Sequence, residues 1–311
     1  MTKREFLKTS LLASAGVLAT PLMATDLRAF PGRFPPATAP QYGLALFPFL
    51  WADDLAELLH LSPAAETKDE TIRAINTNRE YFQFGRSWDV QPDRALELLT
   101  ESRDLLRADK SGTDRAKTQF ALVAGWVAAR VLDHELAATD LSEDLAIALD
   151  THLLRDRHEA AGGTVTASVD ELTEAFALMR HRNLLRLHTF RPEFSDGDGW
   201  LDGFLAYHDA LDASNARYAA AYVNPPTELR PRIASLYQAT DAPIQLAGAL
   251  RRGELTTLVG QSEKLLNGTV DSAYGRALRE GFTQLRVLGS YVEGRGAGAR
   301  VEEVLKETSG R

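Results

Sequence analysis

Cysteine is absent from the 311 residues of this chain. Its absence excludes disulfide bonds, thiolate nucleophiles, covalently attached c-type haem, and zinc or iron–sulfur sites with cysteine ligands. The fold must therefore be held by packing alone. Any metal would have to be bound by histidine, aspartate or glutamate side chains.

Positive charge is also scarce. The chain has 35 Lys and Arg against 43 Asp and Glu, which gives a formal net charge of −8. Contact with phosphate needs clustered Lys and Arg, and anionic lipid attracts the same residues. The composition therefore argues against nucleic acid as a partner and against adhesion to anionic membrane surfaces.

Long hydrophobic runs are missing as well. The uncharged run from Thr9 to Ala24 is shorter than the ~20 residues that a membrane helix needs. The apolar stretch 120–132 is interrupted by Arg130 and is also too short, so it is interpreted as a buried helix. No stable membrane span is expected in the mature protein.

The N-terminus does carry a clear pattern. Residues 1–24 have a basic start, an apolar middle and a small residue, Ala24, at the end, which is the pattern of a cleaved export signal. The segment Lys3-Arg4-Glu5-Phe6-Leu7-Lys8 resembles the twin-arginine (Tat) export signal, whose pattern is Arg-Arg-x-Phe-Leu-Lys. Cleavage removes three basic residues and one acidic residue, so the net charge falls from −8 to about −10.

This resemblance implies a location and a transient partner. Proteins with such signals are moved by the twin-arginine export machinery after they have folded, often with a cofactor or partner subunit in place. We therefore expect a periplasmic protein whose mature chain begins near Thr25. Export without cysteine favours the bacterial envelope over a eukaryotic secretory pathway. The alternative is an ordinary secretory signal.

Strand signals are nearly absent, and the sequence predicts an all-α protein. Residues 25–45 are rich in proline and are interpreted as a tether, because closely spaced prolines disfavour helix. Residues 46–311 are expected to form a single all-α domain, an irregular multi-helix bundle or an orthogonal helical domain. The spacing of apolar residues predicts helices near 46–60, 63–84, 92–108, 113–138, 141–160, 169–190, 199–222, 226–238, 242–252, 255–266, 270–293 and 298–308.

The common catalytic and nucleotide-binding motifs are also missing. The chain contains no GxxxxGK[ST], GxGxxG or GxSxG segment, so it lacks the usual phosphate loops and the hydrolase nucleophile elbow. The sequence identifies no catalytic residue and no cofactor.

The most unusual predicted helix runs from Ser168 to Arg191. Its second half, within 175–192, has no acid and interleaves arginine and histidine with apolar side chains. A helix that is apolar nearly all round is usually buried, and buried arginine needs a partner. One interpretation is an anion or cofactor pocket, and the other is a core helix whose arginines pair with acids on neighbouring helices. The predicted ligand-binding residues are His181, Arg182, Arg186, His188 and, from a later helix, His208.

A second group lies on the helix predicted over 141–160. His152, Asp156 and Glu159 share one face, with His158 beside them. This spacing suits a metal ligand pair or a histidine–carboxylate pair, but helices rich in charged residues produce such pairs by chance. No metal site is assigned.

Three weaker patterns are set aside. Glu57-x-x-His60 occurs once, whereas di-iron bundles need two such motifs and further glutamates. Asp53-Asp54-x-x-Glu57 resembles the Asp-rich motif of class I terpene synthases, but no second metal motif follows. The loop 196–202 is interpreted as a turn before a helix rather than a calcium site, because the ligands of an EF-hand are incomplete.

Two function classes follow. The preferred one is an exported ligand-binding or accessory protein of the bacterial cell envelope, acting as partner of a larger exported enzyme or binding a protein or an anionic small molecule. The alternative is a periplasmic helical enzyme, a lyase or hydrolase or a His/carboxylate metal enzyme, with a cleft lined by histidine and arginine.

Overall fold

The longest apolar helix of the sequence forms the centre of the fold. In helix α6 (Thr113–Ala137), residues 120–132 are all buried except Arg130, which confirms the predicted buried helix. Helix α13 (Ala273–Val292) packs along it.

The computed structural model describes residues 45–62, 69–78, 81, 82, 85, 91–108, 113–163, 167–188, 209, 212–255 and 257–310, without the side chains of 69, 70, 179–188, 309 and 310.

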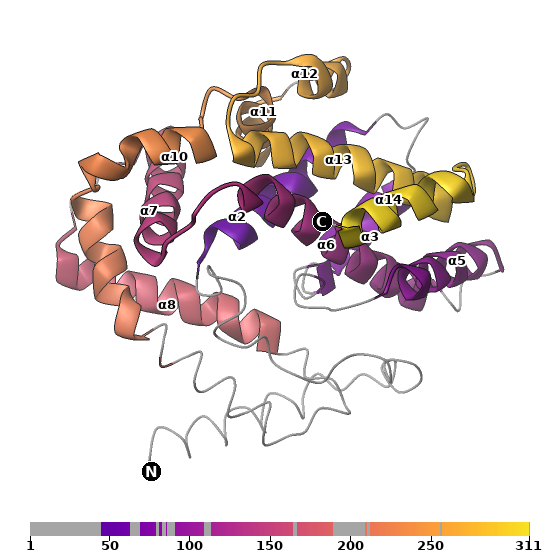
Figure 1. The fold of residues 1–311 in the computed structure, drawn as a ribbon, viewed down its shortest axis with the longest axis horizontal. Helices are drawn as coiled ribbons and strands as arrows, with labels where there is room; N and C mark the ends of the chain where they lie inside the picture. Colours follow the sequence, from indigo (N-terminus) through magenta and orange to yellow (C-terminus); the bar gives the residue numbers. More distant parts are fainter. Residues whose placement is uncertain are drawn as a thin grey trace, which may run out of the picture.

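Several helices pack around this central pair (Figure 1). Helices α5 (Pro92–Ala108) and α3 (Asp69–Thr77) contact α6 on one side, and α14 (Gly298–Gly310) lies against α5 and α13. Helix α2 (Phe47–Leu58) runs between α6, α11 and α13. A short 3₁₀ turn, η3 (Leu59–Leu61), follows α2.

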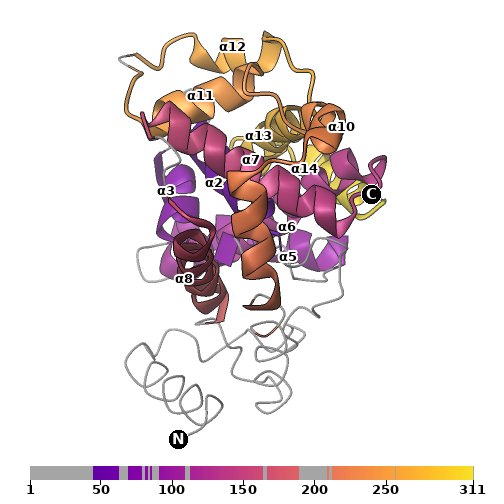
Figure 2. The same cartoon turned by 90° about the vertical axis from the view of Figure 1, so that its left-hand side faces the viewer.

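The other helices extend the molecule away from α5, as Figures 1 and 2 show. They are α7 (Glu143–Ala160), α8 (Val169–His188), the helical segment 212–223, η5 (Thr227–Leu229), α10 (Arg230–Leu236), α11 (Ala242–Arg251) and α12 (Gln261–Asn267). A small second core, separate from the main one, joins α7, α8 and the segment 212–223 with the start of α2. Its buried members are Leu46, Ile147, Phe176, Tyr218, Ala219 and Tyr222.

The predicted fold class is confirmed. The described residues are organised as an all-α multi-helix arrangement, and none of them is in a strand. Along the described residues, no helix is both long enough and apolar enough to cross a membrane.

Two buried aspartates fix the starts of helices that lie far from them in the sequence. Asp150 in α7 accepts hydrogen bonds from the backbone N–H groups of Leu46 and Phe47, at 2.7 and 2.6 Å, where α2 begins. Asp241 accepts from the N–H and the hydroxyl of Ser272, at 3.0 and 2.5 Å, where α13 begins. Free N–H groups at a helix start need acceptors and favour negative charge, so these carboxylates stabilise the two starts.

The starts of α12 and α10 differ from the predicted ones by several residues. Helix α12 begins at Gln261 rather than 255. Gly260, just before it, adopts a left-handed conformation (φ 77°), which does not fit inside an α-helix. Helix α10 begins at Arg230, after a 3₁₀ turn, rather than at 226.

Candidate functional site

Four of the five predicted ligand-binding residues lie on α8, but their side chains fall outside the described residues. His181, Arg182, Arg186 and His188 are in the second half of α8 (Val169–His188), where only the backbone is described. His208 lies wholly outside the described residues. The anion site predicted from these residues therefore stays a prediction.

The start of α8 is described and forms a capping box between Ser168 and Glu171. The backbone N–H of Ser168 donates to Glu171 Oε2 at 2.8 Å, and the N–H of Glu171 donates back to Ser168 Oγ at 3.3 Å. These bonds favour the ionised carboxylate, and they lower the pKa of Glu171 below its ordinary value. The predicted position of this helix start is confirmed.

The side chains of the second predicted group, on α7, have different partners. Asp156 Oδ2 accepts a hydrogen bond of 2.7 Å from the hydroxyl of Tyr237, and the ring of His152 meets the ring of Tyr237 edge-on at 5.8 Å. Glu159 instead pairs with Arg155 at 3.5 Å. Among the described residues, no group of three or more histidine or acidic side chains is arranged to hold a metal ion.

A buried charged cluster lies next to this group. We call Asp54, Arg157, Arg251 and Tyr274 the Asp54 cluster. Asp54 Oδ2 is 2.8 Å from Arg157 Nη2 and accepts a hydrogen bond of 2.8 Å from the hydroxyl of Tyr274. Asp54 Oδ1 accepts from Arg251 Nη1. The cluster connects α2, α7, α11 and α13, and the ring of Tyr237 meets that of Tyr274 at 5.3 Å.

Burial and the Asp54 carboxylate set the ionisation of the cluster. Burial alone would lower the pKa of Arg157, but the neighbouring Asp54 outweighs that effect and raises the pKa. Burial raises the pKa of Tyr274 well above its usual value, and Asp54 adds to the shift. The pKa of Tyr237 is raised by burial and by Asp156. The arginine is therefore charged and both tyrosines are neutral hydrogen-bond donors at neutral pH.

This cluster has the character of a structural network. Asp54 is only 3 % exposed, and both of its carboxylate oxygens accept bonds from its own neighbours. Arg157 also donates to the carbonyl of Leu50 at 2.8 Å, at the middle of α2. The sequence did contain a signal for this burial, because Asp54 shares a helix face with Trp51 and Leu58, which are both buried.

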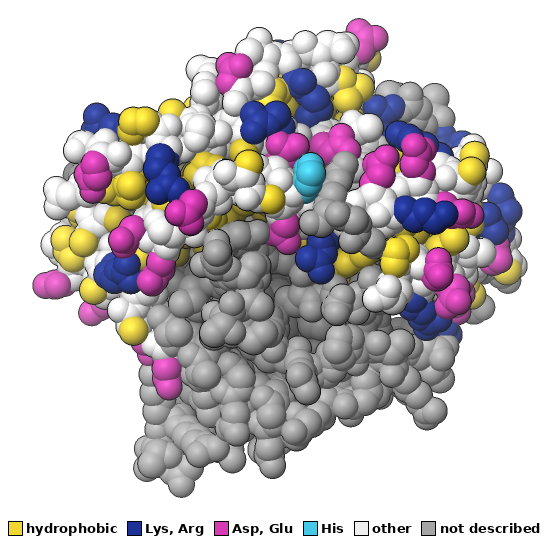
Figure 3. Space-filling model, in the orientation of Figure 1, with side chains coloured by type: hydrophobic (Ala, Val, Ile, Leu, Met, Phe, Trp, Pro, Cys, Tyr) yellow, Lys and Arg dark blue, Asp and Glu magenta, His cyan; other side chains and the backbone are white. Residues whose placement is uncertain are grey.

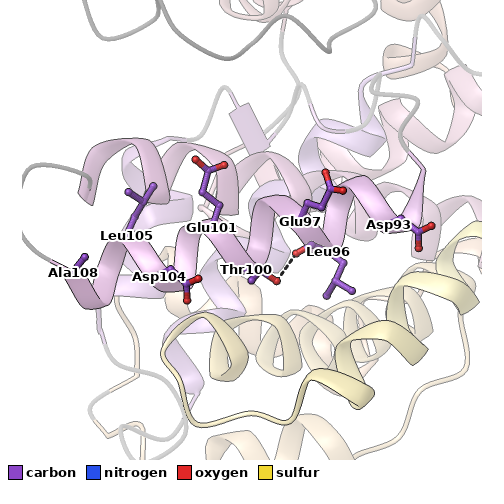
Figure 4. Close-up of a pocket in the computed structure, with 8 residues that line it drawn as sticks. All are labelled: Asp93, Leu96, Glu97, Thr100, Glu101, Asp104, Leu105 and Ala108. Carbon is purple, nitrogen blue, oxygen red and sulfur yellow. Dashed lines mark hydrogen bonds between the residues drawn. The ribbon is translucent and has the colours of Figure 1, made fainter.

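A groove runs along the surface of α5. It is an open cavity of about 770 Å³, and Figure 4 shows the described residues that line it. Half of these are acidic: Asp93, Glu97, Glu101 and Asp104. The others are Leu96, Thr100, Leu105 and Ala108. In Figure 4, Glu97 and Glu101 lie along one edge of this face, and Leu96 and Asp104 lie along the other.

The carboxylates of the groove differ in how firmly they are held. Both oxygens of Glu101 are bound by α6, through Arg115 at 2.5 Å and Gln119 at 3.0 Å. Among the described residues, Glu97 pairs with Arg94 alone, three residues earlier on the same helix, at 2.8 Å. Glu101 therefore joins α5 to α6, whereas Glu97 stays at the surface.

Asp104 and Thr100 complete the acidic and polar part of the lining. Asp104 lies 3.2 Å from Arg103, its neighbour in the chain. The hydroxyl of Thr100 is 2.8 Å from the hydroxyl of Tyr291, which fixes α5 against the end of α13. No motif in the sequence marks this face, because apolar and acidic residues at helical spacing are typical of any surface helix.

The remaining described surface shows no strong asymmetry of charge on the face drawn in Figure 3, where acidic and basic side chains are interspersed.

No family model, curated protein sequence or solved structure matches this chain. The function is therefore inferred from the site geometry and the sequence alone.

Proposed function

We propose that this chain is an exported protein of the bacterial cell envelope that binds a ligand or a partner protein and acts as an accessory component. The observation that carries the proposal is the groove along α5. It has about 770 Å³ of space, it is open to solvent, and its described lining combines apolar side chains with carboxylates.

The size and lining of the groove suit binding. Ligand sites in proteins usually have volumes of about 300–1,000 Å³ and combine an apolar lining with a few polar groups that orient the ligand. The carboxylates of the groove favour a cationic occupant. This charge is opposite to that of the ligand predicted for α8, so the two are separate predictions.

The cellular location is part of the proposal and rests on the N-terminal sequence. Residues 1–24 have the pattern of an export signal, and their resemblance to the twin-arginine signal favours a protein that leaves the cytoplasm already folded. That route suits an accessory protein of a larger exported enzyme. The enzyme alternative rests on His181, Arg182, Arg186 and His188, whose side chains are outside the described residues, and it stays a prediction.

Site-specific labelling tests the proposal, because the chain has no cysteine of its own. An environment-sensitive fluorophore would be attached to Ala108→Cys in the groove and, as a matched control, to Glu174→Cys on an exposed face of α8. Both proteins would be titrated with periplasmic extract of the source bacterium, separated into small-molecule and protein fractions.

We expect a saturable change in fluorescence from the groove label and no change from the α8 label. The active fraction tells a small ligand from a protein partner. The proposal is wrong if neither fraction changes the signal of the groove label, or if both labels respond equally.

A further inference from the structure

The groove extends along most of the length of α5. Its described lining recurs at steps of three or four residues from Asp93 to Ala108, which places it on one face of the helix. These 15 steps correspond to about 22 Å at a rise of about 1.5 Å per residue. Such a face suits an elongated occupant, and a helix of about four turns has the same length.

The chemistry of this face is amphipathic. Leu96, Leu105 and Ala108 supply apolar contacts, and carboxylates lie along both edges (Figure 4). None of the described lining residues is basic. The complementary surface is therefore a stripe of apolar side chains flanked by lysine or arginine, which is the pattern of a basic amphipathic helix.

The acids at the N-terminal end of the groove can exchange their partners. Glu97 is 64 % exposed and pairs with Arg94 on the same helix, and such surface pairs contribute only about 0.2–1 kcal/mol. Asp93 makes no ion pair with any described residue. Both oxygens of Glu101 are already bound by α6. The acids available to bind an occupant of the groove are therefore mainly Asp93 and Glu97.

We propose that the groove along α5 is the docking surface for a basic amphipathic helix of a partner protein. This inference rests on the proposed function and adds the chemistry of the partner. The mature chain has a net charge of about −10, which attracts a basic segment over a longer range.

Peptide binding tests the proposal with three probes. The first is a peptide of about 16 residues with leucine on one helical face and lysine on both flanks. The second has glutamate in place of every lysine, and the third has the composition of the first in an order that is not amphipathic. Binding to the full-length mature protein would be measured by fluorescence anisotropy at two salt concentrations.

Two matched pairs of substitutions locate the binding surface. Asp93→Lys with Glu97→Lys reverses two charges four residues apart at the start of α5. Asp170→Lys with Glu174→Lys makes the same change at the same spacing at the start of α8, where both residues are exposed. Circular dichroism and urea unfolding establish that each variant is folded. If the α5 pair does not fold, Asp93→Asn with Glu97→Gln replaces it.

We expect the basic amphipathic peptide to bind, and added salt to weaken the binding. The α5 charge reversal should lower the affinity by about tenfold or more, which corresponds to about 1.4 kcal/mol. The neutral α5 pair should lower the affinity by a smaller factor, and the α8 pair should leave it unchanged. The acidic peptide and the non-amphipathic peptide should not bind.

The inference is overturned if the basic peptide does not bind, if the acidic peptide binds equally well, or if the α5 variants bind as the wild-type protein does. Its failure differs from that of the proposed function. A groove label that responds to periplasmic extract but not to the basic peptide leaves the proposed function standing and excludes this partner class. A label that responds to the peptide but not to the extract supports this partner class and contradicts the proposed function.

Discussion

At the scale of single residues, three buried aspartates do much to fix the position of the helices. Asp54, Asp150 and Asp241 are each 3 % exposed or less. Each of them accepts hydrogen bonds or pairs with groups more than 30 positions away along the chain. A buried carboxylate is costly unless it is fully paired, so each aspartate specifies which elements must meet.

The Asp54 cluster gives the sharpest prediction for stability. Asp54→Ala removes the carboxylate that pairs with the Arg157 guanidinium, whose side chain is 18 % exposed, and that accepts from the buried hydroxyl of Tyr274. Removing one partner of a buried pair usually costs about 3–5 kcal/mol, so we expect the free energy of unfolding to fall by about that amount. Urea unfolding followed by circular dichroism measures it.

An exposed pair serves as the control for this change. Glu302 pairs with Lys306 at 3.6 Å on the surface of α14, so Glu302→Ala should cost less than about 1 kcal/mol. A loss of less than about 1 kcal/mol for Asp54→Ala as well would mean that water solvates Arg157 and that the cluster is not a structural network.

Gly125 gives a second prediction at this scale. A Cβ atom at this position in α6 would lie 1.9 Å from the carbonyl oxygen of Phe82, so the backbones would have to move apart. Alanine normally stabilises a helix relative to glycine by about 1 kcal/mol. We expect the opposite for Gly125→Ala, which should lower the midpoint of thermal unfolding.

Gly248 in α11 is the matched control. A Cβ there would come closest to the end of the Arg252 side chain, at 3.0 Å, and this flexible group can move away. Gly248→Ala should therefore be neutral or stabilising. The close approach of α6 to Phe82 would be refuted if Gly125→Ala stabilised the protein as much as Gly248→Ala.

At the scale of elements, local sequence predicted helix positions well where a local signal existed. Helix α5 occupies its predicted range, 92–108, and α8 begins at its capping box. Helix α7 begins at Glu143 rather than 141, because Ser142 caps it by accepting from the N–H of Leu145 at 3.3 Å. Capping and periodicity are properties of neighbouring residues, so a single sequence reveals them.

Contacts between elements could not be predicted in the same way. The pairing of Asp54 with Arg157 joins positions about a hundred residues apart, and no local pattern links them. The groove was also missed, since it depends on which face of α5 is left open after α6, α13 and α14 have packed against the helix. The predicted site on α8 relied on composition alone.

The capping box of α8 gives a prediction about pH. Because the N–H and the hydroxyl of Ser168 bind the ionised Glu171, the carboxyl pKa is lowered in the folded protein. A lowered pKa means that Glu171 supports the helix start above the ordinary pKa of glutamate, and that this support is lost as pH falls through the lower, folded value. A carbon-13 NMR titration of the Glu171 carboxyl measures this pKa.

Ser168→Ala removes the hydroxyl but keeps the backbone N–H, so the pKa of Glu171 should rise part of the way toward its ordinary value. Glu254, whose pKa is lowered by its hydrogen bond from Arg252, should not change in this variant. An unaltered pKa of Glu171 after the substitution would mean that the hydroxyl makes no contribution to the capping box.

At the scale of the whole molecule, the helical body and the predicted N-terminal signal carry different information. The body is all-α and contains no cysteine, so its stability does not depend on the redox state of its compartment. The signal concerns only the route of export. The twin-arginine route carries folded proteins, and a fold that needs no disulfide can form before export.

The export route is therefore the prediction that belongs to this scale. In the segment Lys3-Arg4-Glu5-Phe6-Leu7-Lys8, Arg4 stands where the second arginine of the twin-arginine pattern lies. Arg4→Lys keeps the charge but removes the only arginine of the pair, so it should block export by this route. The general secretory route requires only a basic start and an apolar run, and it should tolerate the change.

Lys3→Arg is the matched control, because it completes the arginine pair and should preserve or increase export. Cell fractionation and N-terminal sequencing measure the outcome: a mature chain beginning near Thr25 in the periplasm for the wild type and Lys3→Arg, and uncleaved protein in the cytoplasm for Arg4→Lys. Normal export of Arg4→Lys would exclude the twin-arginine route while keeping the periplasmic location. A wild-type chain that keeps Met1 in the cytoplasm would exclude both, because the first 24 residues would then not act as an export signal at all.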